Sequence, residues 1–310
     1  MSDAPAIASA YPKVRLQAYL VVILGVAAIS MGSIFIRLAQ QEGVPSLFIA
    51  AGRLGIASLI LTPITLRRHA SEIRQISRSD LIFAGISGVF LAIHFATWVA
   101  SLEYTSVLIS VVLVNTHPLW VALLEVFFLK ARLGRPVILG LIIGLAGSAV
   151  VALPSGGEFS VGSNPLLGST LALIGAIAVA VYFIIGRKLR GGLSLLAYIW
   201  LVYSCAALVL LLAVILAGIP ILGYPPVAYL WLVGMALIPQ LMGHTSFNYV
   251  LKFLPATYVS IATQFEPAAS AAIAFFLFTE VPSGLQVLGS VVILGGIFLA
   301  TLGQTRANDS

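Results

Sequence analysis

The hydrophobic segments of this sequence contain very few ionisable side chains, and these are the residues that could do chemistry. Glu266 is a carboxylic acid, His94, His117 and His244 are imidazoles, and Arg53 is a guanidinium. An ionisable group in hydrocarbon is costly, so it usually faces a cavity or a partner. Imidazoles, and a carboxyl group taken out of water, can exchange protons near neutral pH. We therefore take Glu266 and the three histidines as candidates for proton coupling or substrate binding.

Glu266 and His117 each precede a proline at related positions of two hydrophobic segments. Glu266 lies about 15 Å along its segment, close to the middle of a bilayer. Proline lacks a backbone N–H, so the carbonyl four residues earlier loses its helical partner and the helix kinks. We expect Pro118 and Pro267 to mark such kinks where two helices line a cavity. The alternative for Glu266 is a protonated side chain in a helix–helix hydrogen bond.

Further polar side chains recur at helical spacing. Gln240, His244 and Asn248 lie four residues apart, so they share one face of a helix. Such a stripe fits the wall of a polar path, and it fits equally well polar contacts that hold helices together, at roughly 1 kcal/mol per bond. The polar candidates for the cavity wall are Ser33, Asn115, Gln240, Asn248 and Thr263.

Aromatic residues and Arg53 complete the set of candidates. Trp98, Tyr182 and Phe247 could form an aromatic wall for an organic solute or its cation; packing or lipid contact is the other role open to each. Arg53 lies some seven residues inside a hydrophobic segment. It could serve as a gate or contact a carboxylate, or it could bond to carbonyls at a helix end.

The composition is that of a membrane protein. Of the 310 residues, 60% are hydrophobic and 8% are charged, against roughly 45–50% and about 25% in ordinary soluble domains. Most apolar runs approach the ~20 residues that a membrane-spanning helix requires. We expect ten transmembrane helices, at about 16–39, 46–66, 80–102, 106–129, 136–153, 166–186, 194–217, 227–250, 256–278 and 284–303.

The basic residues predict the orientation of these helices. Nearly all of the 16 lysines and arginines lie in alternate connections, and short cytoplasmic loops hold an excess of such residues. Both termini are therefore expected in the cytoplasm, in a multi-pass protein of a bacterial inner membrane. The net charge of +6 reflects this belt at the lipid surface, so no nucleic-acid partner is expected.

The sequence contains an internal repeat. At several positions the same residue type recurs 149 positions later in the chain. A shift of 150 relates Gly25 to Gly175 in the same way. We expect residues 1–153 and 166–310 to be five-helix halves joined by a linker at 154–165. Because five is odd, the halves should be inverted, as in many secondary transporters. The matching pairs include Pro118 and Pro267, Gly140 and Gly289, and Gly147 and Gly296.

The segments from Tyr104-Thr105-Ser106 to Leu129 and from Phe253-Leu254-Pro255-Ala256 to Thr279-Glu280 resemble the EamA domain of the drug/metabolite transporter superfamily. The stretch Gly32-Ser33-Ile34-Phe35 resembles its opening signature. One departure is that Glu280 corresponds to Ala131 in the first half. The resemblance implies an all-α, ten-helix carrier that exports small metabolites or drugs, commonly driven by a proton gradient.

We expect an exporter of a small neutral, zwitterionic or cationic metabolite that works by proton antiport and alternating access. Its partners would be the solute, protons and membrane lipid, and the protein would be a monomer or a weak homodimer. Catalytic, metal-binding and cofactor motifs are absent from the sequence, so neither enzymatic activity nor a cofactor is expected. The alternative is a non-transporting membrane scaffold or partner subunit.

Overall fold

The computed structural model describes residues 12–129, 134–152, 163–250, 263 and 265–308, and every regular element in that part of the chain is a helix. Helices satisfy their backbone hydrogen bonds internally, as a lipid environment requires. The elements are α1 (Pro12–Ser30), α2 (Gly32–Gln41), α3 (Ser46–Arg68), α4 (Ala70–Arg74), α5 (Arg78–Tyr104), α6 (Val107–Val114), α7 (His117–Leu129), α8 (Arg135–Ala152), α9 (Pro165–Leu189), α10 (Leu195–Leu216), α11 (Pro226–Met235), η1 (Ala236–His244), α12 (Thr245–Val250), α14 (Glu266–Phe278) and α15 (Gly284–Asn308).

Six helical stretches in the described part are long and apolar enough to cross a bilayer, with mean hydropathy from 1.4 to 2.7. They are Leu20–Gln41, Ser46–Arg68, Arg78–Tyr104, Pro165–Leu189, Leu195–Leu216 and Pro226–Val250. Shorter apolar helices cover Val107–Val121, Arg135–Gly147, Glu266–Phe278 and Gly284–Leu299. The chain is thus an all-helical membrane protein, as its composition predicted.

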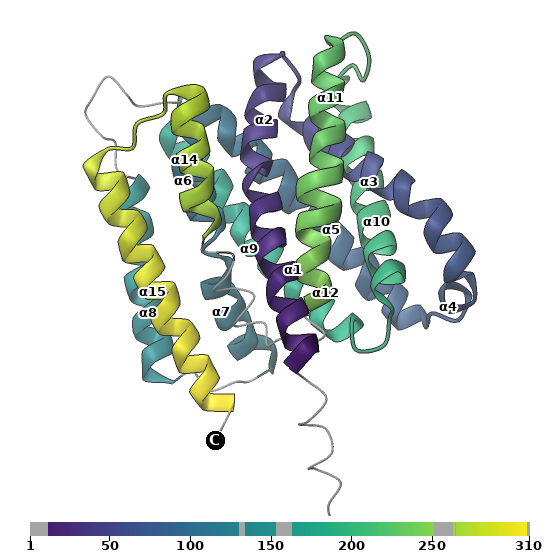
Figure 1. Ribbon diagram of the computed structural model, residues 1–310, viewed down its shortest axis with the longest axis horizontal. Coiled ribbons are helices and arrows are strands. Elements are labelled where there is room, and N and C mark those ends of the chain that lie inside the picture. The colour runs from purple at the N-terminus through teal and green to yellow at the C-terminus, as the bar shows by residue number, and fades with distance from the viewer. Residues whose placement is uncertain (1–11, 130–133, 153–162, 251–262, 264, 309–310) are drawn as a thin grey trace, which may run out of the picture.

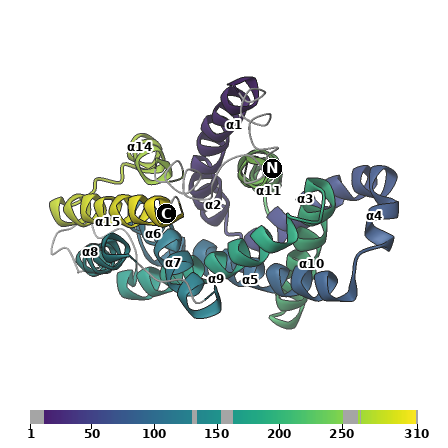
Figure 2. The ribbon, with the colours of Figure 1, turned by 90° about the horizontal axis from the view of Figure 1, so that it is seen from below.

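Helices pack in pairs that join distant parts of the sequence (Figure 1). α5 runs along α9, α3 along α10, and α8 along α15, while α1 and α2 lie against η1 and α11. α14 packs against α6 and α1. Seen from below, α8, α14 and α15 lie at one end of an elongated molecule and α4 at the other (Figure 2).

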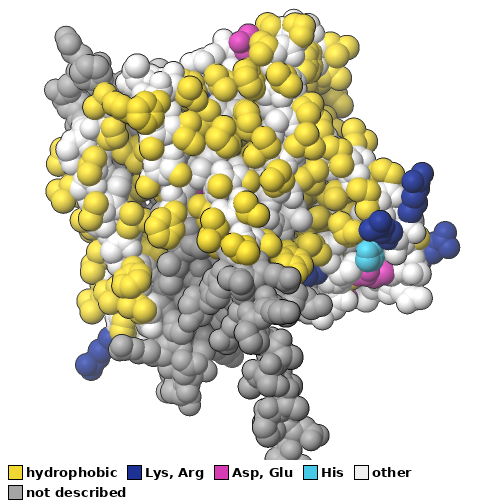
Figure 3. Space-filling view, viewed as in Figure 1, with side chains coloured by type: hydrophobic (Ala, Val, Ile, Leu, Met, Phe, Trp, Pro, Cys, Tyr) yellow, Lys and Arg dark blue, Asp and Glu magenta, His cyan; other side chains and the backbone are white. Residues whose placement is uncertain are grey.

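The outer surface is hydrophobic over much of its area (Figure 3). Large apolar side chains such as Leu59, Leu216 and Phe276 are exposed. A water-soluble monomer rarely carries such a continuous apolar surface, whereas lipid tails would cover it at no cost. Lys and Arg side chains appear at the periphery of the face in Figure 3, mainly near α4.

Three of the expected helices are interrupted, which the hydrophobic pattern did not predict. The first breaks at Met31, between α1 and α2, and the fourth breaks at Asn115–Thr116, between α6 and α7. The eighth continues through a π-helix, η1, which contains Pro239. Prolines explain two of these sites, because Pro118 and Pro239 cannot donate a backbone hydrogen bond to the preceding turn.

Glycines allow the closest helix contacts. A methyl group added at Gly296 would lie 2.7 Å from Gly140 O, and one at Gly147 would lie 3.0 Å from Gly289 O. α8 and α15 can therefore approach only because these positions lack a side chain. The ends of the chain, most of the linker 154–165 and most of the ninth expected helix before Glu266 lie outside the described residues.

Candidate functional site

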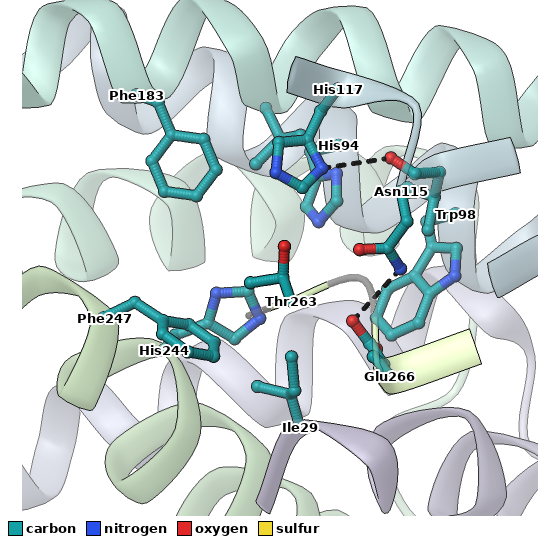
Figure 4. Close-up of a pocket in the computed structure, with 12 residues that line it drawn as sticks. Ile29, His94, Trp98, Asn115, His117, Phe183, His244, Phe247, Thr263 and Glu266 are labelled. Carbon is teal, nitrogen blue, oxygen red and sulfur yellow. Dashed lines mark hydrogen bonds between the residues drawn. The ribbon is translucent and has the colours of Figure 1, made fainter. Parts of the chain in front are cut away.

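A cavity lies inside the helix bundle, where α1, α5, α6, α7, α9, η1, α12 and α14 meet. It contains about 430 Å³ of space unoccupied by protein atoms, including the part that is open to the outside. The lining residues are Ile29, His94, Trp98, Val114, Asn115, His117, Val179, Phe183, His244, Phe247, Thr263 and Glu266, most of which are labelled in Figure 4.

Glu266 is buried in the cavity wall at the first turn of α14. Asn115 Nδ2 donates a hydrogen bond to Glu266 Oε2 at 3.1 Å and another to Val111 O at 2.9 Å. Asn115 is available for this contact because it lies in the break between α6 and α7. Figure 4 shows the Asn115 amide pointing across to the carboxyl group. The two prolines of the sequence pattern therefore flank one side-chain contact: Pro118 follows the break, and Pro267 follows Glu266 directly.

His117 and His94 each use one ring nitrogen to contact a backbone carbonyl. His94 Nδ1 lies 2.9 Å from Gly175 O, and His117 Nδ1 lies 3.3 Å from Val114 O. A carbonyl oxygen can only accept, so Nδ1 carries the proton in both rings and Nε2 is the position left to gain or lose one. Val114 O is the carbonyl that Pro118 cannot satisfy, so His117 replaces the lost helical donor.

Aromatic rings form another part of the wall. Trp98 stacks on His94, with ring centroids 5.9 Å apart and an interplanar angle of 18°. Phe247 and Phe183 lie across the cavity from Trp98 in Figure 4. His244, the third imidazole, contacts the edge of Phe95 at a centroid distance of 5.5 Å. The wall thus combines apolar rings with a few polar groups, as sites for small organic molecules do.

Arg53 lies behind this aromatic layer rather than in the wall. Its side chain is fully buried, its Nε donates to Gln240 Oε1 at 2.7 Å, and its Cζ lies 4.1 Å from the centroid of the Phe95 ring. Its charge is close enough to interact with that of Glu266. Gln240 is thus a hydrogen-bond partner of Arg53 and does not line the cavity.

The structure places the other residues that the sequence suggested for the cavity wall outside that wall. Asn248 exchanges hydrogen bonds with Tyr182, at 3.1 and 3.3 Å, and neither lines the cavity. Ser33 is buried in α2, also away from the wall. The cavity does bring together Glu266, the three histidines, Trp98, Asn115, Phe247 and Thr263.

Sequence reasoning missed two groups of residues. Ile29, Val114, Val179 and Phe183 line the cavity, but apolar residues in apolar helices carry no signal. Arg37 and Glu280 form an ion pair at 3.0 Å, remote from the cavity wall. Arg37 also donates to Thr105 O at 3.0 Å, and Glu280 accepts from Val107 N at 2.8 Å. This cluster connects α2 and the α14–α15 connection to the α5–α6 connection. The only sequence feature that pointed to it was Glu280, which corresponds to Ala131 in the first half.

The cavity offers groups that can exchange protons, polar donors and acceptors, and aromatic surface. Within the described residues, no group of three His, Cys, Asp or Glu side chains could hold a metal ion. The arrangement can therefore bind a small polar or amphiphilic molecule and move a proton at Glu266 or at an imidazole Nε2.

Comparison with known proteins gives consistent likenesses. The model of the EamA-like transporter family matches residues 16–153 and 166–302. A protein of Archaeoglobus fulgidus, named "Uncharacterized transporter", is 23% identical over 88% of this chain and 93% of its own. "Uncharacterized transporter YdfC" of Bacillus subtilis is 23% identical over 87% of this chain and 86% of its own. A solved crystal structure with 20% identity has a TM-score of 0.64, over 95% of this chain and 99% of that chain, which shows a common fold.

Proposed function

The chain belongs to the EamA-like transporter family, and from this premise we propose that it is a secondary transporter that exports a small metabolite in exchange for protons. It is a multi-pass membrane transporter that acts on a small molecule in a lipid environment. The observation that carries the finer proposal is the buried Glu266 carboxyl group, which lines the same cavity as three imidazoles.

The architecture we propose has ten transmembrane helices in two inverted halves, residues 1–153 and 166–310, joined by the linker 154–165. Reciprocal glycine contacts support it. A methyl group at Gly25 would meet Ser246 and Phe247, and one at Gly175 would meet Thr97 and Trp98. These sets are equivalent under the shift of about 149 residues. A two-fold relation between the halves would produce such exchanged contacts, as it would the Gly147–Gly289 and Gly296–Gly140 approaches.

Proton antiport requires a group whose protonation changes when the solute binds or leaves. Glu266 accepts a hydrogen bond from Asn115 in the described structure, and His94, His117 and His244 surround the same space. In the mechanism that we propose, the two halves rock about the cavity, and Glu266 takes up a proton on one side and releases it on the other. The imidazoles pass that proton or hold the polar groups of the solute.

The solute that we propose is neutral, zwitterionic or cationic, with an amino-acid-like or drug-like structure. The cavity wall contains a carboxyl group but no lysine or arginine, and Arg53, which lies behind Trp98, carries only a single charge. A phosphorylated anion with two negative charges would therefore not be neutralised there. Aromatic rings from Trp98, Phe183 and Phe247 provide apolar surface beside the polar groups. We place the protein in a bacterial inner membrane with both termini in the cytoplasm, because basic residues gather in alternate connections.

The decisive experiment uses inside-out vesicles or proteoliposomes with an imposed proton gradient and a screen of amino acids, nucleosides and cationic dyes. We expect gradient-driven uptake of at least one solute into inside-out vesicles and its loss in Glu266→Gln, which keeps the shape of the side chain but cannot ionise. Glu42→Gln, at the end of α2 and away from the cavity, is the matched control. Full gradient-driven flux in Glu266→Gln would remove the coupling role, and no flux of any solute would favour a non-transporting role.

A further inference from the structure

The Arg53 guanidinium is a buried charge with unused hydrogen-bond donors. Its side chain is 0% exposed, and only Nε has an acceptor, Gln240 Oε1. Nη1 and Nη2 have no partner in the part of the chain that the structure describes. Buried charges are normally paired and hydrogen-bonded, because a charge removed from water without partners is strongly unfavourable. A hydrogen-bond acceptor at Nη1 and Nη2, and above all an anionic one, would therefore stabilise the Arg53 side chain.

Aromatic rings lie against the Arg53 guanidinium, while its Nη1 and Nη2 atoms are buried without an acceptor among the described residues. The guanidinium is planar, and all of its N–H bonds point outward in that plane. Phe95 covers one face at 4.1 Å from Cζ, and the Trp98 ring centre lies at 5.8 Å. Ring contacts of this kind stabilise the charge without using any N–H group. The edge formed by Nη1 and Nη2 keeps the geometry that matches a carboxylate with two parallel hydrogen bonds.

This edge lies one side chain away from the cavity. A methyl group added at Gly32 would lie 3.9 Å from Arg53 Nη1 and 3.3 Å from Trp98 Cη2, so the indole ring and Nη1 border the same position. Trp98 itself lines the cavity. Ser33 Oγ, on the same helix as Gly32, and Trp98 Nε1 are also buried and without a partner among the described residues. Two donors, Arg53 Nη1 and Trp98 Nε1, thus lack an acceptor in the region where α2, α3 and α5 meet.

We propose that the Nη1–Nη2 edge of Arg53 binds the carboxylate of the transported solute when the Trp98 ring moves aside, while Glu266 receives its ammonium group. This inference rests on the proposed function and narrows its substrate class to zwitterions of the α-amino-acid type. Glu266 and Trp98 line the same cavity, and Arg53 lies behind the Trp98 ring, so the two charged groups border one space once that ring moves. A proton and the ammonium group then compete for the Glu266 carboxylate, which is the condition for exchange.

The test compares matched solutes that differ only in the carboxylate. Proteoliposomes with a proton gradient receive radiolabelled leucine, phenylalanine or threonine, or the corresponding amides, which keep the ammonium group and the side chain. We expect the wild-type protein to carry at least one amino acid about 10-fold or more faster than its amide, the scale of a charged hydrogen-bond pair. Equal rates for acid and amide in every pair would overturn the inference and leave the proposed transport intact.

Variants show whether Arg53 is the residue that senses the carboxylate. Arg53→Met should lower the rate for the amino acid by a much larger factor than the rate for its amide, so that the two rates converge. Arg53→Lys, which keeps the charge but loses the fork, should retain part of the preference. Gly32→Ala places a methyl group beside Nη1 without changing the charge, and it should also lower only the amino-acid rate. A variant set that slows acid and amide equally indicates a structural role and contradicts the proposal.

Binding distinguishes failure of the inference from failure of the proposed function. The same pairs of solutes are added to purified protein, and thermal stabilisation is measured for wild type and Arg53→Lys. If nothing is transported but an amino acid stabilises the protein more than its amide does, and Arg53→Lys weakens this difference, the carboxylate site stands and the transport proposal falls. If the transport screen finds that only nucleosides or dyes are carried, transport stands and the carboxylate site is refuted.

Discussion

At the scale of single residues, the central contact is the hydrogen bond between Asn115 and Glu266. It joins the break between α6 and α7, where Asn115 lies, to the first residue of α14, which is Glu266. Asn115 uses one amide nitrogen for both Val111 O and Glu266 Oε2. The side chain of Asn115 is 3% exposed and that of Glu266 is 7% exposed. In such a dry place, the loss of one donor changes the environment of the carboxyl group substantially.

We therefore expect Asn115→Leu, which keeps the branching of the side chain but has no donor, to lower proton-driven flux by about 10-fold or more, since a hydrogen bond to an ionisable group is worth roughly 1.5–3 kcal/mol. The matched control is Asn248→Leu, another buried asparagine whose partner is Tyr182 and which lies outside the cavity wall. Flux per folded protein should fall for the first variant and stay near wild type for the second. The reverse order would exclude Asn115 from the working site.

The Arg37–Glu280 pair gives a second expectation at this scale. Both side chains are largely buried, so a single reversal, Arg37→Glu or Glu280→Arg, should destabilise the protein by about 3–5 kcal/mol, as loss of a buried ion-pair partner does. The double reversal should recover only part of this. Arg37 also donates to Thr105 O and Glu280 accepts from Val107 N, and neither bond survives the exchange. Thermal unfolding of the four proteins measures the coupling; additive effects would mean that the pair contributes nothing.

At the scale of helices, the contact between α8 and α15 depends on positions without side chains. Adding a methyl group at Gly296 would bring it within 2.6 Å of Gly144 N, a backbone atom that cannot turn away. The same addition at the next residue, Gly295, meets nothing within 4 Å. Of these two neighbouring glycines, Gly296 therefore packs directly against the backbone of α8, whereas Gly295 has free space beside it.

Gly296→Ala should therefore lower the melting temperature by several degrees, because forced separation of packed elements costs about 1–3 kcal/mol and each kcal/mol shifts Tm by roughly 2–4 °C. Gly295→Ala should leave Tm unchanged or slightly higher. The measurement is thermal unfolding in one detergent for both variants. Equal melting temperatures would mean that the helices separate without cost.

Sequence patterns predicted the helices far better than their interruptions. Apolar runs indicated where helices lie, and Pro118 pointed to the break between α6 and α7; the kink expected at Pro267 involves residues outside the described part of the chain. Gln240, His244 and Asn248 appeared as one stripe, but η1 is a π-helix, which changes the angle between residues four apart. Gln240 consequently reaches Arg53, His244 faces the cavity and Asn248 meets Tyr182. Ile29 and Phe183 could not be selected, because nothing distinguishes an apolar residue at a cavity from one in a core.

At the scale of the whole molecule, the internal repeat and the basic residues carry the orientation that we propose. The family match covers residues 16–153 and 166–302, one unit on either side of the proposed linker. If each half crosses the membrane an odd number of times, as we propose, the total is even and the two ends of the chain lie on one side of the membrane. The basic connections favour the cytoplasm for that side.

We expect reporter fusions to the first and last residues to give the same cytoplasmic signal, with a fluorescent protein that folds only in the cytoplasm and a phosphatase that is active only outside. A fusion in the connection 217–225, between α10 and α11, should give the opposite signal and serves as the internal control. Opposite signals from the two termini would refute the inverted arrangement.

In the alternating-access cycle that we propose, the π-helix η1 affects the relative free energies of the two open states. Its counterpart under the internal repeat, residues 87–95, is ordinary α-helix inside α5. Two identical inverted halves would give the inward-open and outward-open states equal free energies, because the two-fold rotation that relates the halves also interchanges those states. A wider helical turn in only one half removes that degeneracy, so an unloaded carrier of this design has a preferred resting side even when no gradient is applied.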